Sequence, residues 1–202
     1  MTAVTIVPTG TANTASVRAA FNRLGATVTE VGAADDVASA AALVLPGVGA
    51  FGAAISRVDD LGLRQPLQDR VEAGAPTLAI CVGMQLLSGT SEESPGAQGL
   101  GVIDYPVGRF GVHLKVPQLG WNQVEPAPGS RFVESGWAYF ANSFRLEHVP
   151  EGWVGATTDY GGEFVSAMER GDVLACQFHP ELSGRWGAQL LARWLEKTGV
   201  TA

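Results

Sequence analysis

The chain has 202 residues, of which 46% are apolar and 16% charged, and this balance argues against a disordered protein and for one globular domain spanning residues 1–202. A formal net charge of -7 argues against binding to nucleic acid or to anionic lipid, which requires clustered Lys and Arg. No apolar run approaches the roughly 18 residues that span a bilayer and no secretory signal is visible, so we expect a soluble cytoplasmic protein.

The first half of the chain is predicted to alternate strands with helices. Val17 and Phe21 lie one helical turn apart within residues 14–24, and Gly25 ends that helix. The predicted strands cover residues 3–7, 26–31, 42–45 and 77–80, and the predicted helices cover 14–24 and 63–73. Short apolar strands separated by helices are typical of a parallel sheet covered on both faces.

The second half contains strands without helices until its last element. The segments 96–101 and 117–129 are rich in turn residues, and the predicted strands cover 112–116, 137–140, 153–158, 164–169 and 173–178. Residues 184–197 place Trp186, Leu190 and Trp194 on one stripe, which predicts a helix docked on the core. The pattern therefore predicts an α/β fold, a mainly parallel sheet flanked by helices with an antiparallel extension.

Cys81 has the local context of a nucleophile. The apolar strand 77–80 leads into it, Gly83 follows two residues later, and a helical stretch begins there. A cysteine at the start of a helix experiences the positive end of the helix dipole, which favours the thiolate. The alternative is a small buried cysteine inside a strand, and the segment alone leaves both interpretations open.

His179 is the best candidate for the base that a thiolate requires. It follows the apolar strand that ends near Phe178, and catalytic groups of parallel sheets gather at the carboxyl ends of strands. Glu181 lies two residues further on and could accept a hydrogen bond from the imidazole. A solvated histidine at a strand end is the alternative for this segment.

The remaining candidates are weaker. Cys176 is interpreted as a core residue, and His113 and His148 as surface residues without a nearby carboxylate. The loop 46–52 is rich in glycine, which would let its backbone approach a ligand, although such a segment is usually only a turn. Two cysteines and three histidines lack the spacing of a zinc site, so we expect no metal and no cofactor.

Together these segments resemble the class I glutamine amidotransferases and, among them, the glutaminase subunits of imidazole glycerol phosphate synthases. The resemblance covers nearly the whole chain. It is carried by four motifs: Pro46-Gly47-Val48-Gly49-Ala50-Phe51-Gly52, Cys81-Val82-Gly83-Met84-Gln85-Leu86-Leu87, Pro117-Gln118-Leu119-Gly120-Trp121-Asn122 and Gln177-Phe178-His179-Pro180-Glu181.

The resemblance implies roles for individual residues. Cys81 would attack the glutamine amide to form a thioester, His179 would move the protons and Glu181 would orient His179. The implied oxyanion donors are the backbone groups of Val82, Val48 and Gly49. The implied substrate-binding residues are Gln85, Glu93, Gly49, Ser143 and Phe144.

The resemblance also implies a partner, a (β/α)8-barrel cyclase that would receive the ammonia through a heterodimer contact. The residues expected at this contact are Asn13, Pro117, Gln118, Trp121, Asn122 and Leu182. Among the positions that depart from the family pattern, Ala79 replaces a glycine, Asn142 stands where histidine is common, and Leu182 replaces a lysine.

Two other functions remain open at this point. The chain could be the glutaminase subunit of another synthase, such as those for anthranilate, guanylate or pyridoxal phosphate. It could also be a non-catalytic subunit that only binds a partner, although Cys81, His179 and Glu181 are all present.

Overall fold

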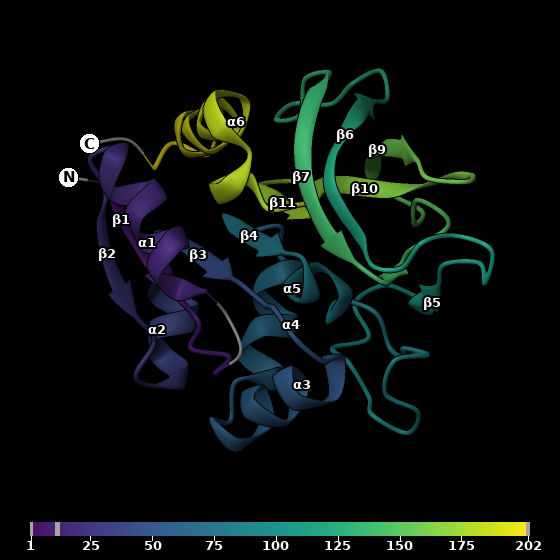
Figure 1. The fold of residues 1–202 in the computed structure, drawn as a ribbon. Coiled ribbons are helices and arrows are strands. Elements are labelled where there is room, and N and C mark those ends of the chain that lie inside the picture. The colour runs from purple at the N-terminus through teal and green to yellow at the C-terminus, as the bar shows by residue number, and fades with distance from the viewer. Residues whose placement is uncertain (1, 11–12, 201–202) are drawn as a thin grey trace.

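The computed structural model describes residues 2–10 and 13–200, and over these ranges nine strands form one mixed sheet (Figure 1). The strand order is β2-β1-β3-β4-β11-β10-β9-β6-β7. The five neighbouring strands from β2 to β11 are parallel, and each later pair is antiparallel. The predicted α/β architecture with an antiparallel extension is therefore confirmed.

The bounds of the strands follow the apolar segments of the sequence. They are β1 Ala3–Ile6, β2 Thr27–Glu30, β3 Ala42–Leu45, β4 Thr77–Ile80, β5 Gly108–Arg109, β6 Gln118–Pro126, β7 Gly136–Asn142, β8 Phe144–Arg145, β9 Val154–Asp159, β10 Glu163–Arg170 and β11 Val173–Cys176. The strands β3, β4 and β11 are buried along their whole length, as expected for parallel strands covered on both faces.

The helices pack on both sides of the parallel strands. They are α1 Thr14–Arg23, α2 Ala34–Ser39, α3 Phe51–Asp60, α4 Arg64–Glu72, α5 Val82–Gln85 and α6 Gly184–Lys197, with a 3-10 turn η1 at Pro180–Leu182. In Figure 1, α6 lies above the parallel strands and α3 and α4 lie below them. Phe21 of α1 packs edge-to-face on Trp194 of α6, so the first and last helices close the core together.

Two predictions for the second half are wrong. Residues 112–116 form turns instead of a strand, and Val112 is 98% exposed, because no neighbouring strand pairs with this segment. The segment predicted as turns, 117–129, contains β6, a nine-residue strand that pairs with β7 and β9. The ladder hydrogen bonds from two neighbours outweigh the local turn preference of Gly120 and Pro126.

The order of the strands places two motifs side by side. β4 and β11 are parallel neighbours, with Ile80 opposite Cys176. The residues that follow them, Cys81 and Gln177 to His179, therefore emerge from adjacent strands at the same edge of the sheet.

Candidate active site

Cys81 occupies a strained turn between β4 and α5. Its φ is 53°, and it is the one non-glycine residue with positive φ in the described part of the chain. The backbone cost of about 1–3 kcal/mol is tolerated only where the surroundings hold the conformation. Here Cys81 N–H donates to the Cys176 carbonyl at 2.7 Å, so β11 fixes the turn that projects the thiol.

Gly83 makes this turn possible by allowing a close backbone contact. A Cβ at Gly83 would lie 1.9 Å from the Leu45 carbonyl oxygen, and one at Gly47 would lie 2.7 Å from the Gly83 nitrogen. The glycine-rich loop after β3 therefore packs directly on the cysteine turn, which only residues without a side chain permit.

His179 and Glu181 form a buried pair at the end of β11. The His179 Nδ1 lies 2.9 Å from the Glu181 Oε1, and the two side chains are 5% and 3% exposed. Burial lowers the pKa of His179, but hydrogen bonds and charge interactions with Cys81 and Glu181 outweigh burial and raise it to about 10. The arrangement therefore holds His179 as an imidazolium beside Cys81 at neutral pH.

Cys81 and His179 face the same cavity, whose volume is about 290 Å³. The residues that line it follow β3, β4 and β11, belong to α5, to the end of β7 and to the start of β8, or lie in the segments after α5 and β7. Its lining residues are Val48, Gly49, Cys81, Val82, Gln85, Glu93, Ala141, Asn142, Ser143, Phe144 and His179. All the residues named above as oxyanion donors or substrate-binding residues line this cavity.

Two polar side chains of the cavity are already anchored. Gln85 Nε2 donates to the Phe144 carbonyl at 3.2 Å and to Gln177 Oε1 at 2.9 Å. Glu93 Oε2 accepts from Phe51 N–H at 2.7 Å, which ties this carboxylate to the loop 46–52 and to the start of α3. The other oxygen of Glu93 accepts no hydrogen bond from the described residues.

The two predicted oxyanion elements are hydrogen-bonded to each other. Val82 N–H donates to the Gly47 carbonyl at 3.3 Å, so this donor is occupied in the described conformation. The helix α5 is one turn long, because the carbonyls of Leu86 and Leu87 accept hydrogen bonds from the segment 100–103. A single helical turn contributes little dipole, so the helix-dipole argument from the sequence carries little weight here.

The expected interface residues separate onto different surfaces. Trp121 is 54% exposed and packs edge-to-face on Tyr139, while Leu182 in η1 is 41% exposed. Asn13 caps α1, and Pro117 is exposed just before β6. The remaining two, Gln118 and Asn122, lie on the face of β6 opposite Trp121, because side chains alternate along a strand. Gln118 is buried there, and the Asn122 side chain donates to the Asp159 carbonyl at 2.9 Å.

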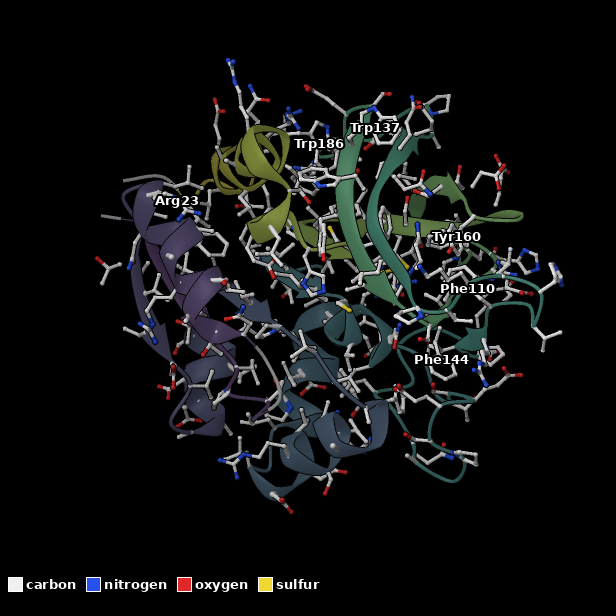
Figure 2. All side chains as sticks on the ribbon, in the orientation of Figure 1. Arg23, Phe110, Trp137, Phe144, Tyr160 and Trp186 are labelled. Carbon is white, nitrogen blue, oxygen red and sulfur yellow. The ribbon has the colours of Figure 1, made fainter. Side chains whose placement is uncertain are left out.

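An exposed apolar surface lies on the outer face of β6 and β7. We call it the β6–β7 face; its residues are Leu119, Trp121, Trp137 and Tyr139, together with Leu182 of η1. Trp186 of α6 lies against Gly136 at the far end of β7, near Trp137 in Figure 2. The face also reaches the start of α6, because a Cβ on Gly184 would lie 3.6 Å from Trp121.

Three residues near the site were given no role there by the sequence analysis. Ala141 and Asn142 line the cavity from the end of β7, and the Gln177 amide lies 3.7 Å from the Cys81 sulfur. The motif containing Gln177 was visible, but its side-chain contacts depend on how β4 and β11 pair. Within residues 2–10 and 13–200, no group of three His, Cys, Asp or Glu side chains is arranged to hold a metal ion.

The two cysteine and histidine predictions made outside the site are confirmed by the burial of the side chains. Cys176 is fully buried, and burial followed by the charges of Glu169 and Glu181 raises the pKa of its thiol. His113 and His148 are exposed. Ala79 is buried in β4 between β3 and β11. The helices of the described ranges include none long and apolar enough to cross a membrane.

The chain is similar to known proteins over nearly its whole length. Residues 6–198 match the family described as glutamine amidotransferase class-I. The chain is 42% identical over 201 residues to the imidazole glycerol phosphate synthase subunit HisH of Symbiobacterium thermophilum, with 96% of this chain and 93% of that protein covered. It is also 42% identical to the HisH subunit of Deinococcus radiodurans, covering 95% and 92% of the two chains.

A longer relative and a solved structure extend this comparison. The chain is 38% identical to the chloroplastic imidazole glycerol phosphate synthase hisHF of Arabidopsis thaliana, with 95% of this chain and 34% of that protein covered. A crystal structure of a glutamine amidotransferase has a TM-score of 0.77 at 23% identity, covering 97% of this chain and 98% of the other. This structural likeness supports the fold.

Proposed function

Since the chain belongs to the class I glutamine amidotransferases, among the HisH subunits of imidazole glycerol phosphate synthase, we propose that it hydrolyses glutamine and passes the ammonia to a synthase partner. The observation that carries this proposal is the convergence of Cys81 and His179 on one cavity, with Glu181 2.9 Å behind the imidazole. The reaction would serve histidine biosynthesis, and the cytoplasmic location expected from the sequence remains a prediction.

The proposed reaction begins with attack by the Cys81 sulfur on the side-chain carbonyl carbon of glutamine. The tetrahedral intermediate collapses as His179 donates its proton to the amide nitrogen, so ammonia leaves and a thioester remains. His179 then takes a proton from water, the hydroxide attacks the thioester, and glutamate and free Cys81 result. Glu181 holds the imidazole in the orientation that both steps use.

The oxyanion of each tetrahedral intermediate needs donors that the described conformation does not yet offer. Val82 N–H is bonded to the Gly47 carbonyl, and we propose that the loop 46–49 turns to release it. Gly49, with φ of 88°, gives this loop the freedom to present its own N–H groups. A change in the loop would also move Glu93, which holds Phe51 N–H.

Substrate recognition is proposed to follow the charges of the cavity. The free oxygen of Glu93 suits the α-ammonium group of glutamine, and the backbone near Ser143 and Phe144 suits the α-carboxylate. The described cavity of about 290 Å³ is large enough for a small amino acid such as glutamine.

The proposed partner is a (β/α)8-barrel cyclase that docks on the β6–β7 face. This face exposes Trp121 and Trp137 at 54% and 57%, an unusual concentration of large apolar side chains for a free surface. Leu182 offers the partner an apolar contact, so a partner subunit with an apolar residue opposite it is expected.

The test is glutamate release from glutamine by the purified chain, alone and with an imidazole glycerol phosphate synthase cyclase and its nucleotide ligand. We expect strong stimulation by the cyclase and no activity in Cys81→Ala. Activity indifferent to the cyclase would contradict the proposed partner and favour a glutaminase subunit of another synthase. No activity under either condition, with the protein folded, would favour a subunit that only binds.

A further inference from the structure

We propose that Gln177 is a positioning residue whose side-chain amide fixes both the sulfur of Cys81 and the side chain of Gln85. This inference deepens the proposed function, since it assigns Gln177 a part in the same reaction. Gln177 Nε2 lies 3.7 Å from the Cys81 sulfur, and Gln177 Oε1 accepts from Gln85 Nε2 at 2.9 Å. One amide thus connects the nucleophile to a residue of the substrate cavity.

The backbone around Gln177 leaves its side chain little freedom. Gln177 is fully buried, and its N–H donates to the Ser166 carbonyl of β10 at 2.8 Å. The preceding residue, Cys176, accepts the 2.7 Å hydrogen bond from Cys81 N–H. The strand end that carries His179 therefore holds Cys81 twice, once through the backbone and once through Gln177.

The contact with Gln85 determines which atom of that amide faces the cavity. Gln85 Nε2 uses its two hydrogens on Gln177 Oε1 and on the Phe144 carbonyl. Its Oε1 is then the group left to accept a hydrogen bond inside the cavity that Gln85 lines. Without Gln177 the amide could rotate and present a donor instead, which would repel the ammonium or amide hydrogens of glutamine.

The contact with Cys81 favours the charged form of the sulfur. A donor N–H aimed at sulfur stabilises thiolate over thiol, and Gln177 supplies it without a charge of its own. The charged groups near Cys81 are His179 beside it, Glu181 behind the imidazole and Glu93 elsewhere in the cavity lining. A change at Gln177 leaves all three groups in place, so its effect on the sulfur can be measured separately.

The test is the pH dependence of alkylation of Cys81 by iodoacetamide, a reaction that requires neither glutamine nor a partner. We expect Gln177→Met to move the midpoint of the profile upward by about 0.5–1 pH unit, because the variant loses one hydrogen bond to a charged group. The buried Cys176, whose pKa is raised, should stay unlabelled, which mass spectrometry checks. Gln68→Met, which removes a glutamine bonded to the Leu100 carbonyl outside the cavity lining, is the matched control and should leave the midpoint unchanged.

A second readout separates positioning from general loosening of the structure. Glutamine KM should rise about tenfold in Gln177→Met, since one good hydrogen bond corresponds to roughly that factor. If Gln177→Met does not fold, Gln177→Asn replaces it in the test. Asparagine keeps the amide but is one methylene shorter, so it should shift the midpoint of the alkylation profile in the same direction. A folded variant with an unchanged alkylation midpoint overturns the proposal. A shifted midpoint in a chain without glutaminase activity would support the positioning role and refute the proposed function instead.

Discussion

The imidazole of His179 is hydrogen-bonded to Glu181 and interacts with Cys81 in a buried site. Its side chain is 5% exposed, and Glu181, 2.9 Å away, is 3% exposed. Such a pair works only when both members are present, because removal of one leaves a buried charge without a partner. The exchange of protons in the proposed reaction therefore depends on Glu181 as much as on His179.

Glu181→Gln should lower the rate of Cys81 alkylation by a glutamine analogue at least about a hundredfold, as expected when the orienting carboxylate of a triad becomes an amide. The amide can no longer stabilise the imidazolium, and its NH2 can favour the wrong tautomer. The inactivation rate with a diazo-ketone analogue measures this. Glu196→Gln, an exposed carboxylate on α6, is the control and should react like the unmodified chain.

The pKa of His179 also predicts how stability changes with pH. Because the folded-state pKa is about 10 and the ordinary value is 6.5, the contribution of the imidazolium is fully present below pH 6.5 and is lost as pH rises through 10. Urea unfolding should show the free energy of unfolding falling across this window by up to about 1.4 kcal/mol per pH unit. If the free energy of unfolding of His179→Gln fell with pH by the same amount, His179 would not be the source of this pH dependence.

At the scale of elements, the site depends on the contact between the loop 46–52 and the turn at Cys81. The backbones of the two segments are in direct contact, and Val82 N–H donates to the Gly47 carbonyl. The two glycines are therefore required by the geometry of adjacent parallel strands, and any side chain here separates β3 from β4.

Gly83→Ala should destabilise the fold by about 2–4 kcal/mol, in the range of overpacked core substitutions, because its Cβ would lie 1.9 Å from the Leu45 carbonyl. Equilibrium urea denaturation gives the change in the free energy of unfolding. Gly89→Ala is the matched control, since a Cβ there meets no atom within 4 Å. Equal unfolding free energies for the two variants would show that the contact is not tight in solution.

At the scale of the molecule, the cavity and the β6–β7 face are joined by the same strands. Tyr139 N–H donates to Ser183 Oγ at 3.0 Å, and the Tyr139 carbonyl accepts from His179 N–H at 2.9 Å. Trp121 packs on the same tyrosine. A partner bound at Trp121 would therefore be connected to His179 through Tyr139.

Trp121→Ala should raise the Kd for the cyclase at least tenfold, as expected for a large aromatic anchor at an interface. Isothermal titration calorimetry with the cyclase measures the affinity, and urea unfolding checks that the chain remains folded. Val112→Ala removes an apolar side chain that is 98% exposed outside the β6–β7 face and should change the Kd little. Equal affinities for both variants would place the partner on another surface.

The sequence by itself determined the elements with strong periodicity and the motifs that carry the chemistry. The last helix was predicted at its observed bounds, Gly184–Lys197, because Leu190 and Trp194 form a clear apolar stripe. The pattern of strands and helices also determined the α/β class, and the residues around Cys81 and His179 determined the family resemblance.

Only the tertiary structure decided which residues meet. Local turn preference misplaced β6, because its ladder bonds come from β7 and β9, and local residue types do not report this pairing. The contact of Gln177 with Cys81 and the burial of Gln118 depend on strand pairing and on the face to which each side chain points. Hydrophobic periodicity reports whether a residue is buried, whereas the identity of its neighbour is fixed by pairing between segments separated by about a hundred residues, such as β4 and β11.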